Sequence, residues 1–366
     1  MKAWLDRILG KTPAAVSHVK PQAGELLVNA YATALVLPAL DFPHQLVSQR
    51  DWHDPALAPH LAGFVQHMLG RGDGQMTMRR YALMRHIERV QQQVSLQVDA
   101  AAWPAYLNWA QQANAISFIP NASILDAQGR ELMDAAGTET DPAAALPCLP
   151  QALARKARTE AALSALGLRV PSSLPATLAE FELRMREPAE IAARALATLA
   201  AAVRAEAVST DNELSSAHIL ARLPDAQAAL SPRELDFMQT AQPDDQSVTN
   251  MGWRYECVAV FAWALGLQEE LLFPESICDV SALSQLFFEA GTVNAVLRQA
   301  RPVDATELLD ALDETFRLHW CVRDAQINQK PVPEGLLPGV VTERHRALNW
   351  LVRFENADWD DVDMPT

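Results

Sequence analysis

The sequence of 366 residues has no long apolar run, few cysteines and fewer basic than acidic residues. No stretch approaches the roughly 18 uninterrupted apolar residues that a membrane-spanning helix requires. The longest candidate, residues 257–267, has the length of a core helix. The N-terminal apolar run contains Asp6 and Arg7, so we predict no signal peptide. The four cysteines are scattered without a CxxC pair, which is typical of reduced thiols in a cytoplasmic protein: Cys148, Cys257, Cys278 and Cys321.

The shortage of basic residues excludes two kinds of surface. Lys and Arg total 30 against 45 for Asp and Glu, which gives a net charge of −15. A nucleic-acid interface and an anionic membrane surface both require a basic face, so we expect neither partner. The charge is also uneven: residues 1–151 carry 11 basic and 13 acidic side chains, and the remainder carries 19 and 32.

The length and the hydrophobic content of 49% predict a globular chain of two domains. Between residues 134 and 151, Gly, Thr and three prolines interrupt any periodicity. We therefore predict a small α+β domain over residues 1–133, a linker over 134–151 and a larger all-helical domain over 152–366. The chain as a whole should be mainly α.

Within the first domain, apolar residues alternate over residues 26–36, as in a half-buried strand. Residues 115–120 form a short apolar run, and residues 124–132 predict a hairpin that turns at Ala127-Gln128-Gly129. Helical spacing occurs over residues 57–69 and 81–94.

Helix boundaries are well marked in the second domain. Capping boxes are predicted at Thr177 with Glu180, Ser231 with Glu234, and Asp304 with Glu307; the helix that follows Asp304 should run to about Asn328. Pro188 begins a helix whose apolar stripe is Ile191, Ala195, Leu199 and Val203, and Gly167 and Gly266 should end helices. Residues 249–267 predict one central helix, apolar on every side beyond Glu256.

The partial matches to catalytic and cofactor-binding motifs have the wrong spacing or the wrong structural context. Gly10-Lys11-Thr12 resembles the end of a phosphate-binding loop, but no strand precedes it. The glycines at 70, 72 and 74 follow a helix, which is the wrong context for a dinucleotide site. His60 and His67 lie two turns apart, which is not a usual chelating spacing. We predict no cofactor and no metal.

Charged residues interrupt three otherwise apolar predicted helices. Glu256 lies one turn inside the central helix, where a lone charge would be costly. Arg323 falls on the stripe formed by Leu309, Leu312, Phe316, Trp320 and Ile327, and Glu343 extends the stripe of the last helix. One interpretation is a polar pocket with catalytic candidates Glu343, His345 and Asp324 and ligand-binding candidates Glu256, Arg317, Arg323 and Arg344.

We favour a second interpretation, in which these residues form a buried ion-pair network that fixes the helix register. Its packing candidates are Trp253, Trp263, Trp320 and Trp350. His319 and His345 could join Glu343 as metal ligands only if the fold brings all three together.

The C-terminus, NADWDDVDMPT, places four aspartates around Trp359. It is either an acidic recognition tail for a basic partner or a solvated end whose tryptophan folds back on the domain, and we favour the latter.

Several motifs together resemble a bacterial family known as domain of unknown function 4272: RKARTEAALSALGLRVPSSLP, REPAEIAARALATL, WRYECVAVFAWALGL, LLDALDETFRLHWCVRDA, GVVTERHRALNWL and WDDVDMPT. The resemblance covers about Arg155 to Thr366. It implies a helical domain in a bacterial cytosolic protein and supplies no activity. The family more often has alanine or leucine where Cys257 and Cys321 stand, which argues against thiol chemistry.

Two functions follow as hypotheses. The leading one is a non-catalytic, adaptor- or immunity-type protein whose acidic helical surface binds a basic protein partner. The other is an enzyme or small-ligand binder that uses the Glu, Arg, Asp and His cluster for an anionic substrate. The sequence does not decide the oligomeric state.

Overall fold

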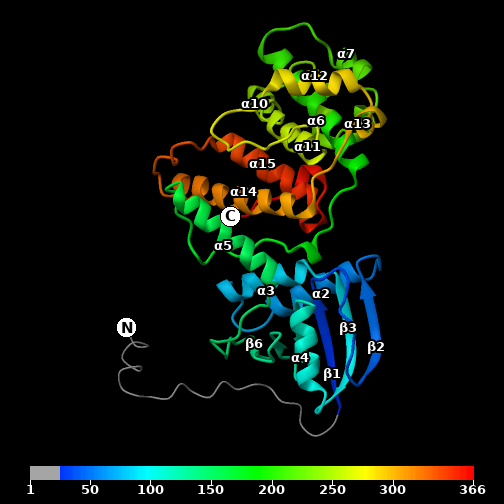
Figure 1. Ribbon diagram of the computed structural model, residues 1–366, viewed down its shortest axis with the longest axis vertical. Coiled ribbons are helices and arrows are strands. Elements are labelled where there is room, and N and C mark those ends of the chain that lie inside the picture. Colours follow the sequence, from blue (N-terminus) through cyan, green and yellow to red (C-terminus); the bar gives the residue numbers. More distant parts are fainter. Residues whose placement is uncertain (1–24) are drawn as a thin grey trace. The chain divides into compact units, whose positions relative to one another are not determined.

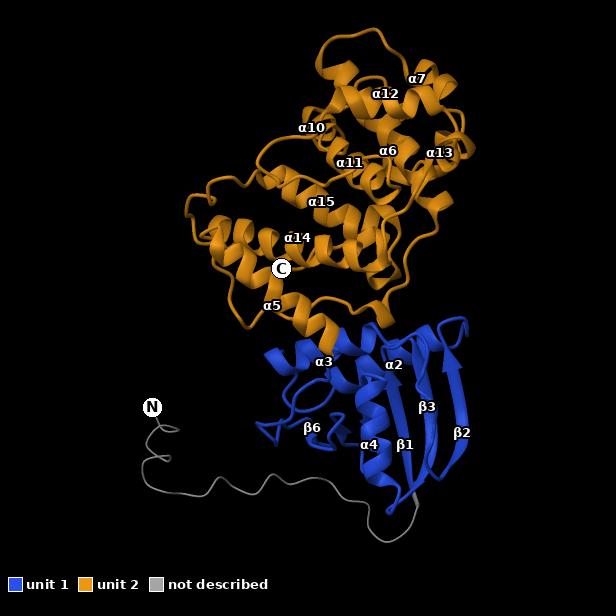
Figure 2. Cartoon of the chain, viewed as in Figure 1, with its two compact units in different colours: residues 1–149 blue, residues 150–366 orange. Residues whose placement is uncertain are grey.

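The computed structural model describes residues 25–366, so Gly10-Lys11-Thr12 lies outside the described residues. The chain divides into two compact units, residues 1–149 and 150–366, here unit 1 and unit 2 (Figure 2). The division falls inside residues 134–151, the predicted linker. Unit 1 holds a small antiparallel sheet and unit 2 is helical, which confirms the predicted fold class.

Unit 1 is built on a six-stranded antiparallel sheet in the order β2-β3-β1-β4-β5-β6 (Figure 1). Alternation of side chains along β1 gives the sheet two apolar faces. The strands are β1 (Glu25–Ala32), β2 (His44–Asp51), β3 (Gln92–Asp99), β4 (Ala115–Phe118), β5 (Ile124–Leu125) and β6 (Glu131–Met133).

Helices cover both faces of this sheet. On one face, Val28 and Ala30 pack with Tyr106 and Trp109 of α4 (Trp103–Gln112). On the other, Tyr31 packs with residues of α2 (Leu57–Leu69) and α3 (Met78–Glu88). This arrangement explains why β1 alternates between two sets of buried side chains.

Most of the local predictions for unit 1 are confirmed, with one correction. α2 has the predicted bounds, and the hairpin turns at residues 127–129, where Gly129 has a φ of +77°. Residues 81–88 are helical as predicted, but the predicted continuation of this helix to residue 94 is wrong. Thr77 caps α3 at its N-terminus, the helix ends at Glu88, and β3 begins at Gln92. The sequence was misleading there because glutamines at 91–93 mask the alternation of Val94, Leu96 and Val98.

Unit 2 consists of α-helices joined by connections of varied length and by 3₁₀ turns (Figure 1). Its helices are α5 (Pro150–Ala165), α6 (Pro188–Ser209), α7 (Ser216–Arg222), α8 (Ala226–Ala229), α9 (Pro232–Gln239), α10 (Asp245–Gly252), α11 (Tyr255–Ala264), α12 (Val280–Ala290), α13 (Val293–Gln299), α14 (Ala305–Ile327) and α15 (Pro338–Leu351). No single helix within residues 25–366 combines the length and apolar composition needed to cross a membrane; α12 and α13 do so only as a pair bent by 110°.

α11 is the central helix of unit 2, because every one of its residues is buried. It packs against α6 and α15, and Phe261 contacts the ring of Trp350 with a centroid distance of 5.4 Å. On α6 the predicted stripe from Ile191 to Val203 is buried as expected.

The predicted caps are confirmed at two of three positions. Ser231 and Glu234 form a capping box for α9, and Asp304 and Glu307 do so for α14. The box at Thr177 is wrong, because the Thr177 hydroxyl donates to Asp313 at 3.0 Å instead.

The helix predicted over residues 249–267 is also wrong, since it is two helices. Bonds of the tighter i to i+3 type, from Arg254 N to Met251 O and from Glu256 N to Trp253 O, separate α10 from α11.

Candidate functional site in unit 2

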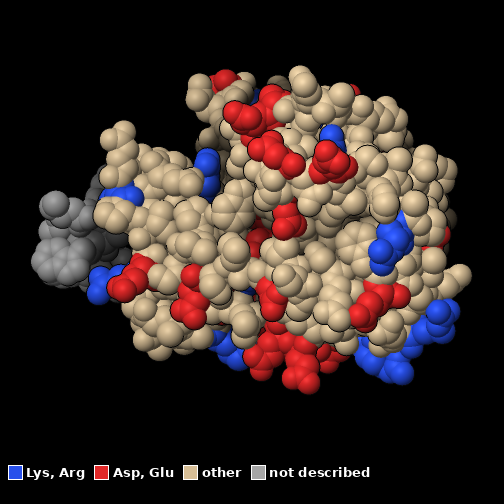
Figure 3. Space-filling model, turned by 90° about the horizontal axis from the view of Figure 1, so that it is seen from above, with Lys and Arg blue, Asp and Glu red and all other residues tan. Residues whose placement is uncertain are grey.

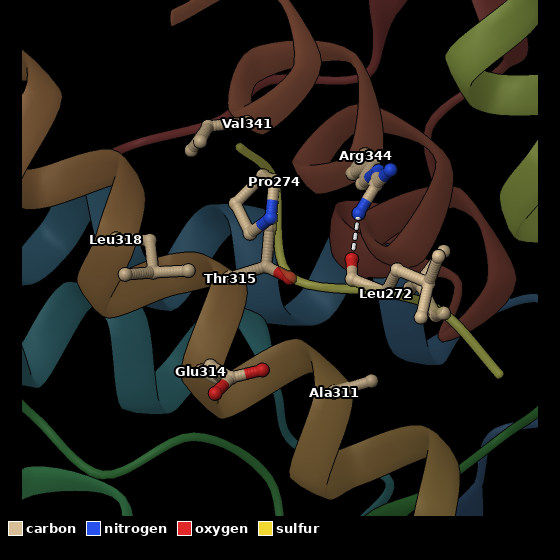
Figure 4. A pocket seen from close by; sticks show the side chains of 9 residues that line it. Leu272, Pro274, Ala311, Glu314, Thr315, Leu318, Val341 and Arg344 are labelled. Carbon is tan, nitrogen blue, oxygen red and sulfur yellow. Dashed lines mark hydrogen bonds between the residues drawn. The ribbon is translucent and has the colours of Figure 1, made fainter. Parts of the chain in front are cut away.

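Glu256 and Arg344 form a buried ion pair between α11 and α15. Arg344 Nε lies 3.1 Å from Glu256 Oε2, and the two side chains are 6% and 2% exposed. Glu256 Oε1 accepts a hydrogen bond from the backbone N–H of Cys278 at 2.7 Å, and Arg344 Nη1 donates to the carbonyl of Leu272 (Figure 4). The pair therefore holds the connection between α11 and α12 at two points, in addition to neutralising its own charges.

A small cavity lies beside Arg344, under the Leu272–Pro274 backbone (Figure 4). Its volume is about 30 Å³. A water molecule needs about 10–15 Å³ by this measure, so the cavity has space for water and not for a substrate. Glu314 of α14 lines it, and burial together with the charge of Asp313 raises the pKa of that carboxyl.

Glu343 belongs to a second, separate ion pair. Its Oε2 lies 2.8 Å from Arg254 Nη1, and both side chains are nearly buried. The Cys257 thiol donates to the same carboxylate at 3.2 Å. Burial and the charge of Glu343 raise the pKa of this thiol, so it stays protonated at neutral pH. Glu343 is thus already occupied by an arginine and a thiol.

Arg317 belongs to a third cluster, at the contact of α14 with α5. It donates to Asp313 at 3.0 Å and 2.9 Å and to Glu160 at 3.2 Å, and its side chain is fully buried. Because Asp313 also accepts from Thr177, the cluster links three separate segments of the chain. The cluster therefore connects α14 with α5 and with the segment around Thr177.

His345 packs against His319, with a distance of 2.8 Å between their Nδ1 atoms. Burial lowers the pKa of His319 to about 4, with a further contribution from Arg323, and burial also lowers the pKa of His345. Both rings are therefore neutral at neutral pH, and one donates its proton to the other. Among residues 25–366, no group of three or more His, Cys, Asp or Glu side chains is placed to hold a metal ion.

Arg323 and Asp324 lie away from the buried pairs. Arg323 is exposed and bonds Gln326, and Asp324 lies 3.7 Å from the Lys330 ammonium. The expectation that Arg323 and Ile327 lie on the buried stripe is wrong, since Ile327 is 70% exposed. The last turns of α14 instead bury Leu318, Cys321, Val322 and Ala325. The predicted polar set is thus distributed over several places and does not line one pocket.

The four predicted packing tryptophans differ in burial. Trp263 and Trp350 are buried, and Trp320 is half-buried against the α5–α14–α15 cluster. Trp253 is 37% exposed, and its ring lies so close to Gly339 that a Cβ there would be 2.7 Å away.

The C-terminal segment (residues 357–366) folds back on unit 2. Trp359 is only 4% exposed, contacts Phe261 and Trp350, and donates from Nε1 to Glu234 at 3.0 Å. Asp360 accepts from the Ser231 hydroxyl at 2.7 Å and from the backbone N–H of Arg233 at 2.9 Å. The segment is therefore fixed by aromatic packing and by a cap on α9.

A pocket of about 490 Å³ lies where this segment meets α6, α9 and α15; we name it the Trp359 pocket. Glu234 of α9 connects the elements that line the pocket. One of its carboxylate oxygens pairs with Arg194 of α6, and the other accepts a hydrogen bond from Trp359 of the C-terminal segment. The lining residues are Arg186, Arg194, Ser231, Pro232, Arg233, Trp350, Asp358, Trp359, Asp360 and Asp361.

Cationic side chains lie over the aromatic rings of this pocket. The guanidinium of Arg186 is 4.5 Å from the ring centroid of Trp350, and that of Arg194 is 5.1 Å from Trp359. Burial lowers the pKa of Arg194, and the nearby Glu234 opposes this shift. Arg194 is not among the residues predicted from the sequence, although an arginine within the alanine-rich α6 is the same kind of signal as Glu256 in α11.

Residues 155–362 match the family described as Domain of unknown function (DUF4272). The match covers more than half of the chain. The chain belongs to this family. Comparison with curated proteins and with solved structures gives no significant match. The matched residues contain the three ion pairs and all ten lining residues of the Trp359 pocket.

Proposed function

We propose that this member of the DUF4272 family is a non-catalytic binding protein that engages a basic protein partner through the acidic surface of unit 2. The observation that carries the proposal is the connection between α11 and α12. This acidic segment (residues 266–279) exposes Glu269, Glu270, Glu275 and Asp279. No lysine or arginine occurs from residue 255 to residue 297, so no neighbour in sequence compensates these charges.

The acidic segment also exposes aliphatic side chains. Leu272 is 63% exposed and Ile277 is 59% exposed. Exposed aliphatic residues among carboxylates provide both contact area and charge complementarity for a basic, partly apolar surface. The segment is held by the Glu256–Arg344 pair at Leu272 and Cys278, so little ordering is needed when a partner binds.

The charge of unit 2 supports the same proposal. Most of its exposed charged residues are acidic, and Figure 3 shows acidic side chains in several groups with uncharged surface between them. Such a field accelerates encounter with a basic partner and depends on ionic strength. Glu256, which is buried, and Glu343, which is 13% exposed, add little to it, because each is paired with an arginine.

The test is affinity capture from a native lysate with the full chain and two variants of equal net charge. Variant one carries Glu269→Lys, Glu270→Lys and Glu275→Lys in the acidic segment. The control carries Glu213→Lys, Glu289→Lys and Glu334→Lys, which are exposed elsewhere on unit 2.

We expect one basic protein to be captured by the wild type and by the control. Variant one should lose it by about tenfold or more, and the capture should weaken as salt is raised. The proposal is wrong if variant one and its control behave alike, or if no captured protein depends on salt.

A further inference from the structure

The Trp359 pocket has the size and the mixture of groups expected of a small-molecule site. Its volume of about 490 Å³ lies within the range of about 300–1,000 Å³ usual for such sites. It combines a buried cation, two indole rings and exposed carboxylates, all from unit 2. Its lining shares no residue with the acidic segment, so an inference drawn here does not depend on the proposed protein partner.

One nitrogen of Arg194 is left for a ligand. Nε donates to Thr198 at 3.1 Å and Nη2 pairs with Glu234. Nη1 has no hydrogen-bond partner within residues 25–366, although the side chain is only 6% exposed. Nη1 is not among the buried polar atoms of residues 25–366 that lack a partner, so it reaches the pocket, and a ligand carboxylate can accept a charge-assisted hydrogen bond from it there.

The other groups of the pocket divide into occupied and available ones. Arg186 is occupied, because its three nitrogens donate to the Trp350 carbonyl, to Glu190 and to the Ala357 carbonyl. Asp360 is occupied by the N-terminus of α9.

Two carboxylates remain available at the rim. Asp358 is exposed and has no hydrogen bond or ion pair to its side chain in the described part of the chain. Asp361 is 74% exposed, and its one cation, Arg233, lies 4.0 Å away and is itself 68% exposed. An exposed pair at this distance contributes little, so Asp361 can exchange Arg233 for a cationic group of a ligand.

We propose that the Trp359 pocket binds a basic α-amino acid, either free or at the carboxyl end of a peptide. The carboxylate of the ligand accepts from Arg194 Nη1, and its cationic side chain lies at the rim with Asp358 and Asp361. A phosphate or another simple anion would meet the rim carboxylates, and a simple cation would meet Arg186 and Arg194. A ligand with a carboxylate at one end and a cationic side chain at the other satisfies both ends of the pocket.

Calorimetric titration of the full chain with four matched probes tests this inference. L-Arginine carries both charges, L-citrulline lacks the cationic side chain, L-argininamide lacks the carboxylate, and Gly-Gly-Arg presents the same residue at a peptide carboxyl end. We expect L-arginine or Gly-Gly-Arg to bind, and the stronger of the two identifies the source of the ligand. L-Argininamide should bind about 10- to 100-fold more weakly than L-arginine, because a hydrogen bond to a charged group is lost.

Two variants locate the ligand. The double variant Asp358→Asn with Asp361→Asn should lower the affinity for L-arginine by about two- to fivefold, because exposed charge pairs contribute modestly. Its affinity for L-citrulline should be unchanged. Arg194→Lys should lower the affinities for L-arginine and for L-citrulline by the same factor, since both ligands carry the carboxylate. If Arg194→Lys does not fold, the comparison of L-arginine with L-argininamide on the wild type carries the same information about the carboxylate.

The control replaces Glu213 and Glu289, which lie outside the pocket, by glutamine and should change neither affinity. The inference is overturned if neither L-arginine nor Gly-Gly-Arg binds, if L-argininamide binds as tightly as L-arginine, or if the aspartate variant weakens L-citrulline as much as L-arginine.

Discussion

In unit 1 the buried arginines donate to backbone carbonyls, whereas in unit 2 they pair with carboxylates. Arg71 donates to the carbonyl of Ala122 at 2.7 Å, and Arg80 donates to that of Gly137 at 2.8 Å. The corresponding side chains of unit 2, Arg194, Arg317 and Arg344, each pair with a buried acid.

The difference follows from the backbone around each arginine. The acceptors in unit 1 belong to irregular segments, whose carbonyls are not used by a helix or a sheet. In a helical unit most carbonyls are occupied by the N–H four residues on, so few acceptors other than carboxylates remain for a buried guanidinium, although Arg344 also uses the free carbonyl of Leu272. Buried acids in unit 2 are therefore explained by the need to neutralise buried arginines, and they do not by themselves indicate catalysis.

Removing one buried arginine from each unit should have the largest effect and tests this comparison directly. Arg344→Met leaves Glu256 charged and buried, which should cost unit 2 about 3–5 kcal/mol of unfolding free energy. Arg80→Met leaves only a neutral carbonyl unpaired, so unit 1 should lose about 1–3 kcal/mol. Urea denaturation gives the free energies, and hydrogen exchange assigns each loss to its unit. Equal losses in the two units would contradict the comparison.

Substituting a glycine of positive φ should have the next largest effect on the unfolding free energy, and the loss should be similar in the two units. Gly266 has a φ of +66°, and a Cβ there would lie 1.9 Å from the carbonyl oxygen of Arg301. Gly137 of unit 1 has a φ of +86°, and a Cβ would lie 2.8 Å from Gly72 N. The left-handed conformation and the overlap together predict a cost of about 2–4 kcal/mol for Gly266→Ala and for Gly137→Ala. Thermal unfolding measures both, and a neutral result for either would show that its backbone can shift.

Acid should destabilise both units through buried histidines. Their pKa values are lowered by burial, to about 4 for His319 and about 3 for His86 of unit 1, against about 6.5 when unfolded. The unfolded chain thus binds more protons below pH 6.5. Stability conferred by the neutral ring is present above that pH and is lost as pH falls toward the folded pKa, by about 1.4 kcal/mol per pH unit for each histidine.

The histidine pair can be separated from other acid effects with His319→Phe combined with His345→Phe. This variant should lose less unfolding free energy between pH 6.5 and 5 than the wild type, with the difference confined to unit 2. Unfolding curves at both pH values provide the measurement. An unchanged pH dependence would mean that the two rings have the same pKa values in the folded and in the unfolded chain.

The smallest effects should be stabilising and alike in both units. Gly63 lies within α2 and Gly252 ends α10, and a Cβ at either position would meet nothing within 4 Å. Gly63→Ala and Gly252→Ala should each raise the unfolding free energy by about 0.4–1 kcal/mol, because alanine restricts the unfolded chain. A loss of stability in thermal melts would show a contact that this geometry does not contain.

The elements that the sequence predicts well are those with strong local signals. Ser231 with Glu234 and Asp304 with Glu307 form the predicted caps because the reciprocal hydrogen bonds involve only neighbours in sequence. The capping box predicted at Thr177 is wrong for the opposite reason. The hydroxyl of Thr177 donates to Asp313, which lies 136 residues away in the sequence.

The site was harder to predict than the fold. The charge of Glu256 in an apolar helix predicted that this side chain is paired, because a lone buried charge is too costly, and in the structure its partner is Arg344 of α15. Which acid pairs with which arginine depends on helix packing, and periodicity along a single helix does not contain that information. The Trp359 pocket requires α6, α9, α15 and the C-terminal segment to meet, so no single stretch of sequence signals it.

A double-mutant cycle on Glu256 and Arg344 tests most directly the claim that buried acids in unit 2 exist to neutralise arginines. The unfolding free energies of Glu256→Gln, Arg344→Met and the double variant are compared with that of the wild type. We predict that the double variant is less destabilised than the sum of the single variants, by about 1–3 kcal/mol, because it leaves no buried charge unpaired. Additive losses, within about 0.5 kcal/mol, would show that the two side chains act independently and would contradict the account.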